Sequence, residues 1–249
     1  MIKKQFLILI SFVFISGGLV TAQGVSMGTD TTKADDNEKM AKKERYMFGM
    51  GNDFWLDAPG NADIRNYNPS FVVSFMFDHP FGTSPLSFAA GLGLQSNNLY
   101  SDAFIQENDI NQKSKFKAIP DSLDYSKNKI STTYLELPVE LRLRMLEDND
   151  LTIAAGFKVG YLINSHTKYK GDNYLNTGTS NSELKIKEHN IPNLVDLRYT
   201  ATARIAYKNF SLFAHYNLTP LFEEDKLVDN SGDPNNMYLI TTGLLFSPF

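Results

Sequence analysis

The chain has 249 residues, a formal net charge of -4 and no cysteine. The lack of cysteine excludes disulfides, thiolate metal sites and cysteine nucleophiles, and the acidic balance does not favour nucleic acid as a partner. Mean hydropathy is -0.27, which by itself is typical of a soluble protein of one or two domains. A membrane-spanning part would therefore have to be recognised from the periodic spacing of its apolar residues.

The N-terminus has the pattern of an export signal. Lys3 and Lys4 precede an apolar run over residues 6–20, and small residues lead to a predicted cleavage site between Ala22 and Gln23. The apolar run is shorter than the roughly 20 residues that a spanning helix needs. We expect residues 1–22 to be removed as a signal peptide, which takes away two lysines and no acid.

A polar segment separates this signal from the patterned part of the chain. Residues 23–45 hold five acidic and five basic residues with little apolar content. This composition predicts a periplasmic linker rather than a second domain. Residues 46–249 are expected to form one all-β domain.

Apolar residues alternate with small or polar ones along this domain. Residues 71–77 carry large apolar side chains at odd positions, and residues 86–94 carry them at even positions. The clearest segment is 133–145, where leucines alternate with four charged residues. The same period recurs in 46–56, 151–163, 195–207, 210–218 and 238–246, the last with its even positions expected outward. A period of two predicts eight strands, each close to the roughly 9 to 11 residues that a tilted strand needs to cross a bilayer.

Connection lengths decide between a soluble β-sandwich and a barrel. The expected long connections are 57–67, 96–130, 164–193 and 220–236, and the short ones are 78–85, 146–150 and 208–209. Strict alternation is typical of a membrane barrel with long extracellular loops, short periplasmic turns and both termini periplasmic. The short turns also pair Tyr207 with Phe210 and Met145 with Leu151, in agreement with the apolar parities. We predict an all-β, eight-stranded antiparallel transmembrane β-barrel, an up-and-down meander in the cell outer membrane.

Two strand segments resemble a known family. The segment Thr133-Tyr-Leu-Glu-Leu-Pro-Val-Glu-Leu-Arg and the small-residue strand Phe88-Ala-Ala-Gly-Leu-Gly-Leu, with the export signal, are similar to the PorT-like outer-membrane barrels over residues 46–249. The resemblance implies a Gram-negative envelope protein with an eight-stranded barrel of the OmpA or OmpX type, and it raises a role in protein secretion. Because Pro138 lacks a backbone donor, we expect a bulge near it.

Charged residues occupy the inner face of neighbouring strands. Extending the pairing from Met145 and Leu151 places Lys158 opposite Pro138 and diagonal to two glutamates. The set expected in the lumen is Glu136, Glu140, Arg142, Arg144, Lys158, Asp196, Arg198 and Arg204. One interpretation is a proton or ion path, or a gate. A structural plug is the favoured interpretation, because side chains fill the interior of an eight-stranded barrel.

The histidines and acids do not form a recognisable catalytic or metal set. His215 lies in a pattern similar to that of lipid A modifying barrels, but Asn217 stands where a serine nucleophile is expected. His166 and His189 lie on one long loop without further ligands, and residues 229–233 lack the downstream glutamate of a calcium loop. We expect that the protein binds no cofactor or metal and is not an enzyme.

The predicted function is therefore a structural or surface-binding role of an outer-membrane barrel that is not an open pore. The alternatives are a subunit of a protein-secretion or envelope complex and, further behind, a lipid A modifying enzyme. The expected partners are outer-membrane lipids, the barrel-insertion machinery and, for the first alternative, other subunits of such a complex. The loops 96–130 and 164–193 are the expected contact surfaces.

Overall fold

The computed structural model describes residues 46–107, 112–145, 150–174, 183–229 and 231–248, all within one compact unit, Asp35–Phe249. The expected signal peptide, its cleavage site at Ala22 and Gln23 and the linker 23–45 lie outside the described residues. Among the residues that the structure describes, no helix is long and apolar enough to cross a membrane.

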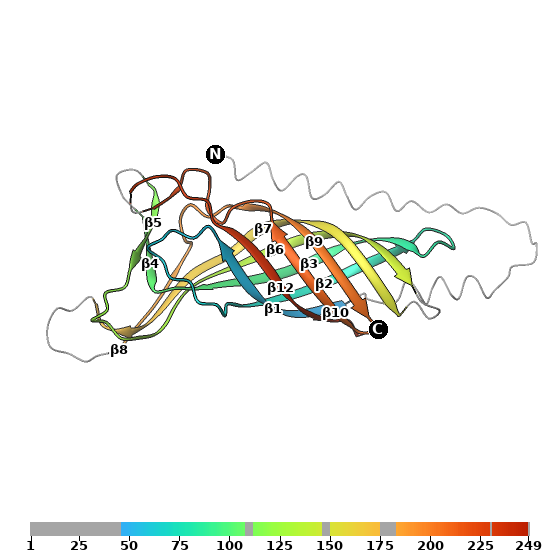
Figure 1. Cartoon of the computed structure of the whole chain (residues 1–249), viewed down its shortest axis with the longest axis horizontal. Coiled ribbons are helices and arrows are strands. Elements are labelled where there is room, and N and C mark those ends of the chain that lie inside the picture. Colours follow the sequence, from blue (N-terminus) through green and yellow to red (C-terminus); the bar gives the residue numbers. More distant parts are fainter. Residues whose placement is uncertain (1–45, 108–111, 146–149, 175–182, 230, 249) are drawn as a thin grey trace, which may run out of the picture. The chain divides into compact units, whose positions relative to one another are not determined.

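Eight long strands of the described chain form a closed antiparallel ring (Figure 1). Each pairs with the next long strand along the chain, and the first pairs with the last through contacts such as Gly51 with Gly243. The strands are β1 (Tyr46–Leu56), β2 (Pro69–Pro80), β3 (Leu86–Tyr100), β6 (Tyr125–Met145), β7 (Leu151–Asp172), β9 (Leu197–Tyr207), β10 (Phe210–Asn217) and β12 (Tyr238–Phe246). The predicted eight-stranded meander is confirmed.

Burial along the strands is the reverse of that in a soluble protein. Leu137 is 58% exposed whereas its neighbour Glu136 is 1% exposed. On the last strand, Leu244 and Phe246 are exposed and Leu245 is buried, which confirms the expected facing. An apolar outer belt around a polar interior is the pattern of a transmembrane barrel.

The short connections lie at one end of the ring, the turn end, and the long ones at the other, the loop end. The pairs Met145 with Leu151 and Tyr207 with Phe210 are found as predicted. The connection expected to begin at Asp78 begins later, because β2 continues to Pro80 and its pairing with β3 runs from Phe71 to Pro80.

The prediction of a bulge near Pro138 is wrong. The register against β3 is the same on both sides of Pro138, and the proline pairs directly with Lys158 of β7. The β3 ladder omits two residue pairs at this point, so the missing donor interrupts the ladder without inserting a residue. The irregularity instead lies between Thr133 and Tyr134, where the β6–β7 register shifts.

The long connections are folded rather than open. Beyond the outer belt, β3, β6 and β7 continue further than the sequence periodicity indicates, and four short strands are added. These are β4 (Ala103–Glu107), β5 (Ser114–Ala118), β8 (Glu183–His189) and β11 (Leu227–Val228). β4 and β5 form a hairpin that β11 joins, and β8 pairs with the outer half of β7. Figure 1 shows β4, β5 and β8 together at the loop end.

A hydrophobic core fills this end of the protein. Its side chains come from barrel strands and from loops far apart in the sequence. Its buried members are Ala62, Leu99, Ala103, Phe116, Ile130, Ile191, Leu194, Leu221, Phe222, Leu227 and Met237. Trp55 packs against this cluster, and its indole donates a hydrogen bond to the carbonyl oxygen of Asn98 at 3.1 Å. We call this folded region, with its short strands, the cap.

The cap predicts a local stability measurement. Phe116 is fully buried, so Phe116→Ala should destabilise the cap by about 3 to 5 kcal/mol through lost packing and a cavity. Trp55 is the chain's one tryptophan, and its fluorescence should shift to the red at lower urea than in the parent protein. The heat-dependent electrophoretic shift of the barrel should remain.

Tyr67→Ala is the control, because Tyr67 is 68% exposed and its loss should leave the fluorescence transition in place. Loss of the barrel's mobility shift in Phe116→Ala at ambient temperature would contradict a cap that loosens separately from the ring.

Candidate functional site

The loop-side half of the lumen is held by one buried ion-pair cluster. The carboxylate of Glu136 on β6 lies 3.0 Å from Lys158 Nζ on β7 and 2.7 Å from Arg198 Nη2 on β9. Lys158 Nζ is also 3.2 Å from Gln95 Oε1 and 3.3 Å from His215 Nδ1. This loop-side cluster therefore joins five strands across the interior.

A second cluster lies towards the turn end. Glu140 Oε2 accepts from Arg142 Nε at 2.9 Å and from Arg204 Nη2 at 3.1 Å. Arg144 pairs with Asp78 on β2, and Arg142 Nη1 lies 3.6 Å from the same carboxylate. This turn-side cluster thus connects β2, β6 and β9 through charged groups that are almost fully removed from solvent.

The structure places seven of the eight expected lumen residues in these two clusters, but Asp196 is not among them. Asp196 is exposed and precedes β9, which begins at Leu197. Its carbonyl oxygen accepts a hydrogen bond from the Leu162 backbone. The expectation failed because the strand was started two residues too early, at Val195.

Two lumenal carboxylates were missed by the sequence interpretation. Asp78 was assigned to a turn. Asp53 lies on β1, whose alternation is less regular, and it accepts from Thr241 Oγ1 at 2.6 Å and from Asn97 Nδ2 at 3.0 Å. Both could have been identified from the alternation, because each acid occupies a strand position whose side chain points to the lumen, as do the positions two residues away.

The interior is therefore packed with side chains. Besides the charged clusters, an apolar cluster occupies another part of the lumen, formed by Met47, Val72, Met76, Ala89, Phe213 and Leu245. The charges are opposed at close range by residues of other strands, as a buried ion needs. Within the described residues no three histidines or acids are grouped as a metal site requires. The arrangement can hold the ring together and fill its centre.

The remaining histidines separate into two locations. His215 faces the lumen beside Lys158. His166 and His189 are direct cross-strand partners on β7 and β8, with ring centroids 5.6 Å apart. They lie beyond the outer belt, in the cap, and burial followed by the charges of nearby lysines lowers the pKa of His166.

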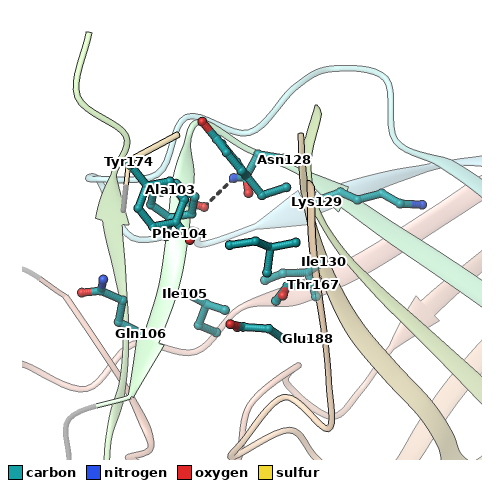
Figure 2. Close-up of a pocket in the computed structure, with 12 residues that line it drawn as sticks. Ala103, Phe104, Ile105, Gln106, Asn128, Lys129, Ile130, Thr167, Tyr174 and Glu188 are labelled. Atoms are coloured by element: carbon teal, nitrogen blue, oxygen red, sulfur yellow. Dashed lines mark hydrogen bonds between the residues drawn. The ribbon is translucent and has the colours of Figure 1, made fainter. Parts of the chain in front are cut away.

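The described part of the cap contains two hollows in which a ligand could lie. Two cavities of about 190 and 220 Å³ lie between β4 and the sheet formed by the outer parts of β6, β7 and β8. They share Ile105, Thr167 and Glu188, so they adjoin, and we call the two together the groove. Figure 2 shows Ile105 and Glu188 facing each other across the first cavity, while the Lys129 side chain extends away from it.

The groove has both aromatic and polar walls. Phe104, Tyr169 and Tyr174 contact one another at ring-centroid distances between 4.9 and 5.3 Å. Asn128 Nδ2 donates to the carbonyl oxygen of Ala103 at 2.8 Å and ties β6 to β4 (Figure 2). Apolar walls with a few fixed polar groups are typical of ligand sites.

A closed ring with an apolar outer belt and a charged lumen defines an integral β-barrel membrane protein. The family model for the outer membrane protein beta-barrel domain matches residues 24–224, and the chain belongs to this family. Its place is therefore the outer membrane.

No curated protein matches the chain. Among solved structures it is similar to the outer membrane protease OmpT from Escherichia coli, with 11% sequence identity and a TM-score of 0.37. That likeness covers 82% of this chain and 79% of OmpT.

The loop-side cluster yields a mutational prediction. Lys158→Met removes one of the two cations beside Glu136, and partial loss of pairing for a buried carboxylate should reduce the free energy of unfolding by about 3 kcal/mol. Lys208→Met is the matched control, because Lys208 forms a long, solvent-exposed ion pair. Its Nζ lies 3.7 Å from Asp150 Oδ2, and its side chain is 58% exposed. That change should cost less than about 1 kcal/mol.

Urea unfolding of the two refolded variants, followed by the electrophoretic mobility of the folded band, measures the difference. Equal midpoints for Lys158→Met and the parent protein would show that the cluster does not hold the ring.

Proposed function

We propose that this chain is a closed outer-membrane barrel that acts at the cell surface through its cap, as a binding protein and not as a pore or an enzyme. The observation that carries the proposal is the filled lumen. Two ion-pair clusters occupy it, and the cap core lies over its loop end. With the passage occupied, the groove in the described part of the cap is where we expect a ligand to bind.

The orientation of the barrel is part of this proposal. Barrels of this kind have short periplasmic turns and longer extracellular loops, and the described chain has its cap at the loop end. The cap would then face the outside, and both ends of the strand meander, at Tyr46 and Phe246, would face the periplasm.

The groove favours a ligand with an apolar or ring-shaped face and a hydrogen-bonding group. Phe104 and Tyr174 offer ring surfaces, and Glu188 offers a carboxylate at the point where the two cavities join. Ile105 lines both cavities and is half-buried, so a probe placed there reports on whatever occupies the groove.

Site-specific photocrosslinking in living cells tests this function. A diazirine amino acid of similar size replaces Ile105 in the groove or, as the control, Tyr67 on an exposed part of the chain outside it. A second control position is Leu141, which is exposed on the outer belt. We expect a discrete adduct from position 105 that is absent from position 67, and lipid adducts from position 141.

The adduct's composition separates the proposed role from the alternatives. A small molecule or glycan supports a surface-binding barrel. One protein recovered in fixed proportion would instead assign the chain to a secretion or envelope complex, as its resemblance to PorT-like barrels suggests. Identical products from positions 105 and 67 would contradict binding in the groove.

A further inference from the structure

The sheet that forms one wall of the groove has a second face, which carries a regular array of lysines. Across the outer parts of β6, β7 and β8, the residue pairs align in rows perpendicular to the strands. One row is Lys127, Lys170 and Lys185, and the next is Lys129, Lys168 and Lys187. The one row between them belongs to the groove face and consists of Asn128, Tyr169 and Ile186. We call the two rows the lysine face.

Like charges directly opposite one another destabilise a sheet, and the acids of this face, Asp172 and Glu183, lie together in one row beyond the lysines. Glu183 pairs with Lys170 at 2.8 Å and with Lys185 at 3.2 Å, which neutralises part of the outermost row. The inner row lacks a comparable acid: within the described part of the chain, Lys168 and Lys187 form no ion pair. A purely solvated face would be expected to mix charges of both signs.

The inner row is also electrostatically crowded. Lys129 lies outside the membrane-spanning part of β6, and its ammonium donates to Asn98 Oδ1 at 2.6 Å. Burial lowers the pKa of Lys129, and the charges of Lys127, Lys168 and Lys187 lower it further. The ammonium groups of the inner row therefore repel one another, and the sheet keeps their strand positions fixed.

The lysine face continues the lipid-facing surface of the barrel. Odd residues of β6 face outward in the belt, and the lysines of β6 keep that parity. On β7, the register shift at Thr133 leaves Ile163 without a partner. This extra residue changes the outward positions from odd to even, which brings Lys168 and Lys170 onto the same side as Lys127 and Lys129. One irregularity thus aligns the array with the belt.

The height of the rows above the belt can be estimated from strand geometry. Leu135 is the last exposed leucine of β6 on this side, and Lys129 is six residues further out. Six residues of strand span about 20 Å, and a strand tilt of roughly 40° gives about 15 Å along the membrane normal. With the cap outside the cell, as proposed above, the rows would lie beyond the acyl chains and headgroups, at the height of the sugars of an outer-leaflet glycolipid.

We propose that the lysine face binds the phosphate groups on the core sugars of a glycolipid in the outer leaflet, beside the barrel. The proposal rests on the proposed orientation, with the cap outside the cell, but not on a ligand in the groove. Fixed rows of ammonium groups attract phosphates, and continuity with the lipid-facing belt places them beside lipids. A soluble anionic polymer is the competing occupant.

The test uses the full chain, folded in a neutral detergent, and fluorescent rough-type lipopolysaccharide with a phosphorylated core as the probe. Lys168→Gln combined with Lys187→Gln should weaken binding by roughly tenfold or more, and added salt should weaken binding to the parent protein. Lys168→Arg with Lys187→Arg should retain it. The matched control is Lys117→Gln with Lys208→Gln, which removes the same charge from exposed sites outside the lysine face and should bind as the parent does.

Three probes distinguish the source of the phosphates. Dephosphorylated lipopolysaccharide should bind weakly to all variants, and a soluble phosphorylated oligosaccharide should bind more weakly than the intact glycolipid. Equal binding of the soluble oligosaccharide would assign the face to a free polyanion and overturn the leaflet assignment. An equal loss in the control variant, or no loss in the double glutamine variant, would overturn the site. Either result leaves the groove crosslink from position 105 as a separate test of the proposed function.

Discussion

Closure of the ring is the constraint on which the rest of the structure depends. A backbone in hydrocarbon must satisfy its own hydrogen bonds, and a closed sheet does so without an edge. Closure also divides every strand into a lipid-facing and a lumen-facing side. With apolar residues committed to the outside, polar groups gather inside a ring of eight strands, where there is room only for side chains. Glu136 and Glu140 are therefore stable only because cations from other strands meet them.

This constraint also explains the cap. The charged part of the lumen ends where the guanidinium of Arg198 stacks on the ring of Tyr134, with Arg198 Cζ 3.8 Å from the ring centroid. The hydrophobic core of the cap begins above this pair. Strands β6 and β7 run through both regions, so the cap is an extension of the barrel wall. Beyond the belt, the three-stranded sheet is no longer required to face lipid. It can turn one face to the groove and present the other as a cationic surface.

The sequence predicted the structure well where a strand alternates regularly between lipid-facing and lumen-facing residues. Alternation along β6 predicted its facing, its pairing with β7 and the contact between Lys158 and Glu136. Connection lengths and turn parity then predicted the topology. Asp196 was misplaced and Asp78 was missed because strand ends depend on what the neighbouring strand pairs with, which periodicity does not report.

The cap could not be predicted in the same way. Phe116, Phe222 and Met237 come from separate connections and have no common period, so their meeting depends on the finished ring. The lysines at 127 and 129, 168 and 170, and 185 and 187 do alternate in the sequence. Their alignment, however, depends on the irregularity opposite Thr133, which a search for regular strands could not locate. The groove arises from the same packing and was equally hidden.

Electrical recording from the full chain in a planar lipid bilayer is the most direct test of the central claim, that the barrel's own side chains fill its lumen. The account predicts a protein that inserts, as shown by its folded mobility in electrophoresis of the same sample, and gives no stable single-channel steps. Reproducible ohmic steps from the folded parent protein would contradict it, because ions would then be passing through a lumen that the paired charges and the cap are held to fill.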